Sequence, residues 1–297
     1  MKDIYTEITN EIISQLEQGI IPWQKPWTGA ANGAISYSTG RAYSLINQML
    51  LLEPGEYITF NQCKAAGGHV KKGSKARVVV FWKVYPKQAT DENGAPVFNE
   101  DGTPKMKNLP VLKYFQVFNL KDCEGIEPRW NNQPRQIADP IAEAEEVFSD
   151  YISREGIAFE QTLSDRACYS PISDRIHLPL MSQFSESAEY YSTAFHEATH
   201  STGHFSRLNR FSSDAGAAAF GSEEYSKEEL VAEIGAATIL SSLGISTDTS
   251  FRNSVGYIQG WLKALKNDKR LIVSAAARAE KAVKLILNQT AAEAEAV

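Results

Sequence analysis

The run His196-Glu197-Ala198-Thr199-His200 decides what the second half of this chain must build. In a helix, residues four apart lie on the same face, so His196 and His200 can present two imidazoles to one cation. A bound metal ion lowers the pKa of a water molecule to about 7, and a neighbouring carboxylate can take the proton. The run therefore predicts a helix with a metal-dependent hydrolytic site, in which His196 and His200 are ligands and Glu197 is the catalytic base.

The residues around this run favour burial of the helix. Four residues before the run, together with Ala198 inside it, are apolar or aromatic: Tyr190, Tyr191, Ala194 and Phe195. Buried imidazole and carboxylate groups need partners, which a metal ion supplies. An exposed polar helix face is the competing interpretation, and these neighbours weigh against it.

A catalytic zinc ion keeps three protein ligands and one open position. One scheme takes the third ligand from His204. On a continuous helix, however, His204 lies about 12 Å along the axis from His196 and could join only after a turn at Gly203.

The second scheme takes a carboxylate from the helix predicted over residues 225–243. Glu229 and Glu233 lie four apart on one face of it, so one can bind the ion while the other accepts a hydrogen bond from a ligand histidine. We expect Glu229 to be the ligand and Glu233 the supporting group, with the reverse assignment left open. Glu228 points elsewhere and is a poor candidate for the ligand. Two histidines and one carboxylate favour zinc, with manganese as the alternative.

The periodicity of apolar residues predicts an α+β fold in two domains. In the first part we expect helices over residues 3–18 and 43–52, and strands over 76–85 and 112–120 around a turn-rich loop. In the second part we expect a mainly helical domain with a small sheet, its strand-like pieces lying within 157–180 and its helices over 140–155, 186–203, 225–243, 253–267 and 269–288.

Pro- and Asn-rich composition near residue 136 predicts the boundary, giving domains 1–136 and 137–297. The two parts differ in charge. Residues 1–136 contain 16 Lys and Arg and 13 Asp and Glu, a net +3, and residues 137–297 contain 14 and 23, a net −9. Such asymmetry indicates different partners for the two parts. The three widely separated cysteines predict no disulfide framework.

The sequence has no apolar run long enough to span a bilayer and no signal-peptide pattern at its start. We therefore expect a cytoplasmic protein that does not engage a membrane.

Residues 64–87 carry seven basic residues and no acidic one, with aromatic residues among the last of them. Cations follow phosphates and aromatic faces stack on unpaired bases, so this composition favours single-stranded nucleic acid. The alternative is a lysine-guarded strand edge with the tryptophans in the core. The candidate DNA-binding residues are Trp23, Lys25, Trp27, Lys71, Lys72, Lys75, Arg77, Trp82 and Lys83.

The chain resembles the ArdC-type antirestriction proteins of conjugative plasmids. Their characteristic segments match residues 22–27, 43–47, 70–75, 190–193, 196–200, 202–204, 207–210 and 225–233, in the same order. The resemblance implies an N-terminal single-stranded-DNA-binding domain, a C-terminal zincin-like metallopeptidase domain and protection of incoming DNA from host restriction.

Three hypotheses about function follow. In the first, the chain is a DNA-binding metallopeptidase whose target is a protein substrate or a component of the restriction system. In the second, it protects single strands without being an enzyme, and its metal site is structural or vestigial. In the third, it is a housekeeping metallopeptidase whose basic stretch only aids solubility.

Overall fold

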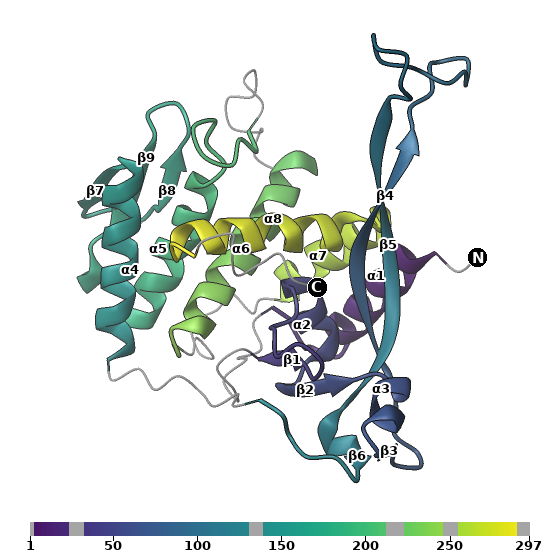
Figure 1. Cartoon of the computed structure of the whole chain (residues 1–297). Coiled ribbons are helices and arrows are strands. Elements are labelled where there is room, and N and C mark those ends of the chain that lie inside the picture. Colours follow the sequence, from purple (N-terminus) through teal and green to yellow (C-terminus); the bar gives the residue numbers. More distant parts are fainter. Residues whose placement is uncertain (1–2, 24–32, 131–138, 212–222, 246–254, 290–297) are drawn as a thin grey trace.

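We describe a computed structural model that covers residues 3–23, 33–130, 139–211, 223–245 and 255–289 (Figure 1). Its α-helices are α1 (Ile4–Glu17), α2 (Leu45–Leu51), α3 (Phe60–Ala65), α4 (Pro140–Glu155), α5 (Ser187–Ser201), α6 (Glu223–Ser242), α7 (Val255–Asn267) and α8 (Leu271–Ile286). Its strands are β1 (Ala34–Ser36), β2 (Gly55–Ile58), β3 (His69–Val70), β4 (Arg77–Gln88), β5 (Met106–Asn119), β6 (Cys123–Glu124), β7 (Ala158–Thr162), β8 (Cys168–Ser170) and β9 (Arg175–Pro179). The predicted α+β fold is confirmed.

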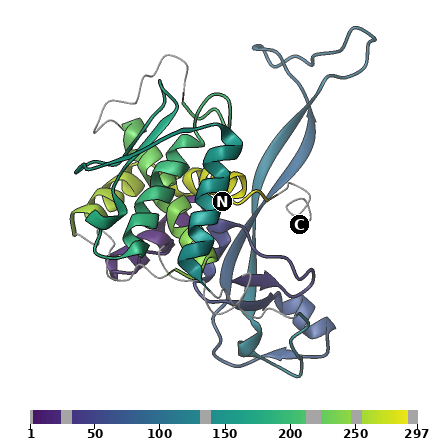
Figure 2. The ribbon, with the colours of Figure 1, turned by 90° about the vertical axis from the view of Figure 1, so that its left-hand side faces the viewer.

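The first part of the chain is built on a sheet of order β1-β2-β5-β4. Strands β4 and β5 pair antiparallel over twelve consecutive residue pairs without interruption. Beyond the body of the molecule these two strands continue alone as a long ribbon (Figures 1 and 2). The second strand of the ribbon begins at Met106, whereas the sequence predicted its start at residue 112. The difference arises because residues 106–111 also pair with β4.

The ribbon is anchored to the body through a buried amide. Asn47 of α2 is fully buried, and its Nδ2 donates to the Val80 carbonyl at 2.8 Å. The Val80 N–H donates back to Asn47 Oδ1 at 2.7 Å. Both main-chain groups of a buried strand residue are thus satisfied by one side chain, which fixes β4 against α2.

One hydrophobic core joins the two parts of the chain. Its buried residues come from α1, α2 and β4 on one side and from α6, α7 and α8 on the other. Trp23 belongs to this core, with its ring 5.1 Å from Trp261 in an edge-to-face arrangement. Because the halves share buried apolar area, their relative position is held by the hydrophobic effect. The predicted boundary at residue 136 lies outside the described residues.

A second core lies within the C-terminal part. The three-stranded sheet has the order β7-β9-β8, with β7 parallel and β8 antiparallel to β9. Helices α4, α5, α6 and α8 pack with it through residues such as Phe148, Tyr191, Phe195 and Ile239. Within the described ranges, no helix is both long and apolar enough to cross a bilayer.

Candidate metal centre

Helix α5 brings two histidines together in the interior of the C-terminal part. Their Nε2 atoms lie 3.1 Å apart. Both side chains are nearly buried, at 11% exposed for His196 and 14% for His200. Two imidazole nitrogens with facing lone pairs repel each other, so at this distance either a proton or a cation must lie between them.

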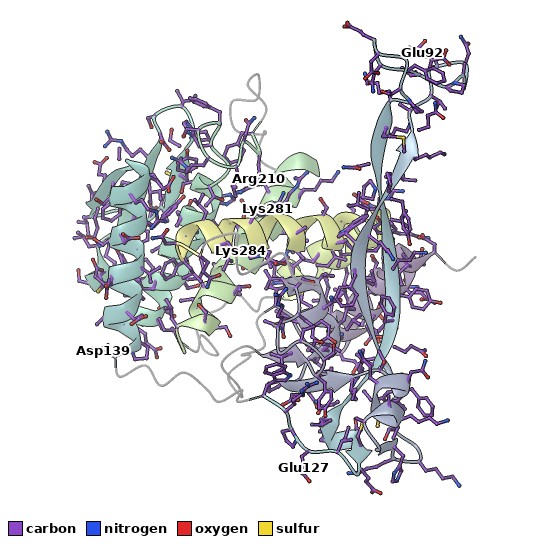
Figure 3. All side chains as sticks on the ribbon, in the orientation of Figure 1. Glu92, Glu127, Asp139, Arg210, Lys281 and Lys284 are labelled. Carbon is purple, nitrogen blue, oxygen red and sulfur yellow. The ribbon has the colours of Figure 1, made fainter. Side chains whose placement is uncertain are left out.

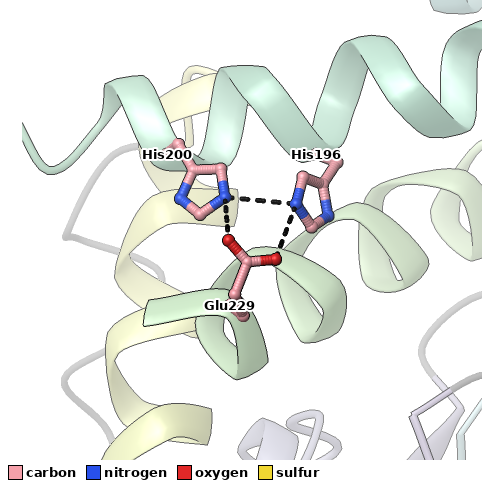
Figure 4. Close-up of side chains that lie close together, drawn as sticks. All are labelled: His196, His200 and Glu229. Carbon is pink, nitrogen blue, oxygen red and sulfur yellow. Dashed lines mark hydrogen bonds and ion pairs between the residues drawn. The ribbon is translucent and has the colours of Figure 1, made fainter. Parts of the chain in front are cut away.

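Helix α6 supplies an anionic oxygen donor to the same place. Glu229 Oε1 lies 3.3 Å from His200 Nε2, and Glu229 Oε2 lies 3.5 Å from His196 Nε2 (Figure 4). Ligands held at about 2.0–2.1 Å around a tetrahedral zinc ion are separated by about 3.3–3.4 Å. The three donors are therefore spaced as the ligands of one small divalent ion require, and they are the single such group among the described residues.

Each histidine also faces a carboxylate on its outer nitrogen. Glu233 Oε1 lies 3.9 Å from His196 Nδ1, and Glu228 Oε1 lies 3.6 Å from His200 Nδ1. Such outer carboxylates orient a histidine and raise its basicity as a ligand. Glu228 is not among the three donors, but its carboxylate does not point elsewhere as expected, because it faces the outer nitrogen of His200.

The acid groups hold positive charge at His200 in the absence of a metal ion. Burial alone would lower the pKa of His200, but hydrogen bonds with Glu228 and Glu229 and the charge of Glu197 raise that pKa to about 10. Burial likewise opposes ionisation of Glu229, yet its hydrogen bonds with His196 and His200 hold its pKa well below the usual range. The site is therefore built for a cation.

Glu197 follows His196 on α5 and is buried, at 8% exposure. Across the residues that the structure covers, no hydrogen bond or ion pair occupies its carboxylate. Its charge acts on His200 and on the Cys168 thiol of the edge strand β8. Glu197 therefore lies near both His200 and strand β8.

His204 does not join the three donors. Helix α5 ends before it, and its Nδ1 lies 2.7 Å from Ser206 Oγ and 3.9 Å from Asp174 Oδ2. The turn after α5 is held to the sheet by an ion pair of Arg207 with Asp174. This turn directs His204 toward the strands and away from Glu229.

Arg210 ties the end of α5 to α6. Its guanidinium donates to the Thr199 carbonyl at 2.8 Å, to Thr202 Oγ1 at 2.6 Å and to Glu228 Oε1 at 2.6 Å (labelled in Figure 3). Glu228 in turn faces His200. Sequence reasoning found no role for Arg210, although it lies in a segment that matches the family, because its partners come from a different helix.

Close contact of the two helices depends on Gly235 of α6. A Cβ at this position would lie 2.6 Å from Thr199 Cγ2 and 2.8 Å from Thr199 Oγ1. Thr199 is fully buried between His196 and His200 on α5 and cannot move aside easily. Gly235 therefore permits the short interhelical distance at which Glu229 reaches both histidines.

The candidate DNA-binding residues are scattered over the first part. The prediction that Trp23 binds DNA is wrong, because its side chain is only 1% exposed and neither face of its ring is open to a base. Lys25 and Trp27 lie outside the described residues. The remaining candidates are all exposed: Lys71, Lys72, Lys75, Arg77, Trp82 and Lys83. Their role in binding stays a prediction.

Two known families match separate stretches of the chain. Residues 2–118 match the N-terminal domain of anti-restriction factor ArdC. Residues 144–278 match the zincin-like metallopeptidase family.

Solved structures and curated proteins resemble the whole chain. The metal-free crystal structure of the antirestriction ArdC protein from plasmid R388 is 36% identical, with a TM-score of 0.71 over 96% of this chain and 97% of that one. Its Mn(II)-bound structure is 34% identical, with a TM-score of 0.70. A DNA primase TraC of Escherichia coli is 35% identical over 96% of this chain, which spans 27% of that primase. An uncharacterized Sinorhizobium fredii protein, y4eC, is 29% identical over 94% of this chain and 89% of its own length.

We expect Gly235→Ala to weaken zinc binding and lower the melting temperature. The new methyl group must push α6 from Thr199, and such overpacking costs about 1–3 kcal/mol. Gly260→Ala is the matched control, because nothing lies within 4 Å of a Cβ there and alanine favours a helix. Zinc titration and thermal melting of both variants check this, and equal zinc affinity in the two would show that close contact of α5 and α6 does not set the site.

We expect zinc binding at pH 7 to release about one proton from His200. The raised pKa keeps this imidazole protonated in the metal-free protein, whereas a ligand must offer its lone pair. Apparent affinity should therefore rise with pH, by up to about tenfold per unit below that pKa. Calorimetry in buffers with different heats of ionisation measures the proton count, and a binding heat that is independent of the buffer would contradict a protonated His200.

Proposed function

Because the chain belongs to the family of ArdC antirestriction proteins, we propose that it is a plasmid antirestriction protein that binds single-stranded DNA and acts as a metallopeptidase. The observation that supports peptidase activity is the group formed by His196, His200 and Glu229, with Glu197 beside it. The DNA half rests on the family and on the exposed basic residues of the first part.

In this proposal His196, His200 and Glu229 hold a divalent ion. Two nitrogen donors and one carboxylate favour zinc. Manganese is the alternative, and the R388 protein has been crystallised with Mn(II). When bound, the ion supplies Lewis acidity to a water molecule and to the carbonyl of the scissile bond.

The chain's own residues then have separate tasks. Glu197 takes a proton from the attacking water and passes it to the departing amine. Glu228 and Glu233 hold the outer nitrogens of the two histidines, so that the inner nitrogens keep their direction. Strand β8, at the edge of its sheet and packed on α5, offers main-chain groups to an extended peptide. The substrate class is therefore an extended segment of a protein.

The competing function is protection of single strands without proteolysis, with a structural metal ion. Glu197 favours the enzyme. A structural site has no need of a buried carboxylate that lies beside the donors and is not committed to an ion pair.

Glu197→Gln tests the enzyme directly. We expect it to retain zinc and single-stranded DNA and to lose peptidase activity by roughly 10²–10⁴-fold, because an amide cannot accept the proton. Glu186→Gln, the same change at the exposed start of α5, should leave activity unaltered. Activity is measured on a denatured protein mixture, and cleavage that persists in Glu197→Gln would rule out Glu197 as base.

The same pair of variants separates peptidase from protector in cells. Plasmid transfer into a restricting recipient is scored for each variant. Loss of protection in Glu197→Gln alone supports a proteolytic mechanism. Full protection by that variant would assign antirestriction to DNA binding.

A further inference from the structure

The ribbon of β4 and β5 has one charged face. In an antiparallel pair, residues directly opposite each other lie on the same face, and the face changes at every residue. The register pairs Phe81 with Lys113, Lys83 with Val111 and Lys87 with Lys107. All five charged residues of the paired segments 77–88 and 106–117 consequently fall on one face, here called the basic face: Arg77, Lys83, Lys87, Lys107 and Lys113.

Every one of these five side chains is exposed, and the paired segments contain no acidic residue. The basic face ends where the ribbon ends, because acidic residues such as Glu92 lie in the tip (Figure 3). The five cations therefore form a surface of one charge sign, which favours an anionic partner.

The opposite face of the ribbon has another task near the body. It carries Val78 and Val80, which pack against the core shared by the two parts. Trp82 lies on this face too, with its ring 6.5 Å from that of Tyr5. Trp82 is therefore on the side away from the basic face, despite being a candidate DNA-binding residue.

A hollow of about 550 Å³ opens at the base of the basic face. Val79, Phe81, Phe115 and Val117 of the ribbon form its floor, and its walls include Tyr43 and Phe60 together with polar residues such as Arg41. This volume is in the range of pockets that accept small organic ligands. None of the hollow's aromatic residues was a candidate binding residue from the sequence.

Aromatic rings continue from the hollow onto the basic face. Ring centroids are 6.0 Å apart for Tyr43 and Phe81, and 5.8 Å apart for Phe81 and Phe115. Farther out, Lys83 and Lys113 hold their ammonium groups 5.5 and 5.8 Å from the ring of Tyr85. Phe115 is 50% exposed, so one side of its ring is open.

We propose that the basic face and the hollow together form the binding site for an unpaired DNA strand. Phosphates follow the five cations, and a base enters the hollow to stack on Phe115 beside Phe81. A duplex keeps its bases stacked on each other and could use only the cations. An acidic protein would likewise use the cations without needing an open aromatic hollow. The inference rests on the proposed single-strand binding and names where it occurs.

The charge arm of the test compares two double variants. Lys83→Gln/Lys113→Gln removes two positive charges from the basic face. Gln88→Glu/Asn108→Asp makes the same change in net charge on the opposite face of the ribbon. Binding of a fluorescent oligothymidylate of about 16 nucleotides is followed by anisotropy over a range of salt concentrations. We expect the first variant to lose affinity, and the slope of log affinity against log salt concentration to fall in magnitude by about 0.7 for each lysine removed. The second variant should show much smaller changes in both affinity and slope.

The aromatic arm uses two neighbouring exposed rings on opposite faces. Phe115→Ala should weaken oligothymidylate binding by roughly tenfold through lost stacking, without changing the salt slope. Tyr114→Ala, whose ring is 56% exposed on the other face, should bind like the parent protein. Circular dichroism and melting curves confirm that all four variants fold.

The outcomes separate this inference from the proposed function. A parent protein that does not bind the oligonucleotide removes the proposed single-strand binding and the site with it. If the parent protein binds, but the variants on the two faces of the ribbon lose affinity equally or not at all, the proposed site is wrong while single-strand binding stands. Binding of a duplex of the same length as tightly as the single strand, with no effect of Phe115→Ala, would overturn the role of the hollow.

Discussion

The contact between α5 and α6 determines most of what this molecule can do. Gly235 has no side chain to collide with that of Thr199, and the two helices therefore pack closely enough for Glu229 to face both histidines. Arg210 holds the same two helices together from the side through Glu228. Several acidic groups and two histidines buried together would destabilise the fold if they were unpaired. Hydrogen bonds among these groups offset the cost of removing their charges from water.

The same helix α6 is also where the two parts of the chain meet. Its residues Leu230, Val231 and Ile234 belong to the core that includes α1, α2 and β4. The segment that carries Glu229 is thus packed against the elements that support the ribbon. In the proposed function, a strand bound along the ribbon and a peptide bound at β8 would be held by one continuous body, so DNA binding could bring the peptidase site to proteins that act on the same DNA.

Local patterns explain which features the sequence could reveal. A spacing of four places His196 with His200, and Glu229 with Glu233, because helix geometry depends on neighbours alone. The contributions of Glu228, Arg210 and Gly235 depend on how two helices cross, which no local pattern encodes.

The ribbon shows the same limit. The basic and aromatic composition of β4 could be read from the sequence, but the shared face with Lys107 and Lys113 depends on the register with β5. Trp23 was misassigned because a tryptophan near a lysine has the composition of a binding surface, whereas its burial depends on packing against Trp261, which is distant in the sequence.

A zinc-soaked crystal measured at the zinc absorption edge tests the central claim most directly. We predict one strong anomalous peak within bonding distance of His196 Nε2, His200 Nε2 and a Glu229 oxygen. A peak bound by His204, or ligated by Glu228 or Glu233 in place of Glu229, would contradict the account.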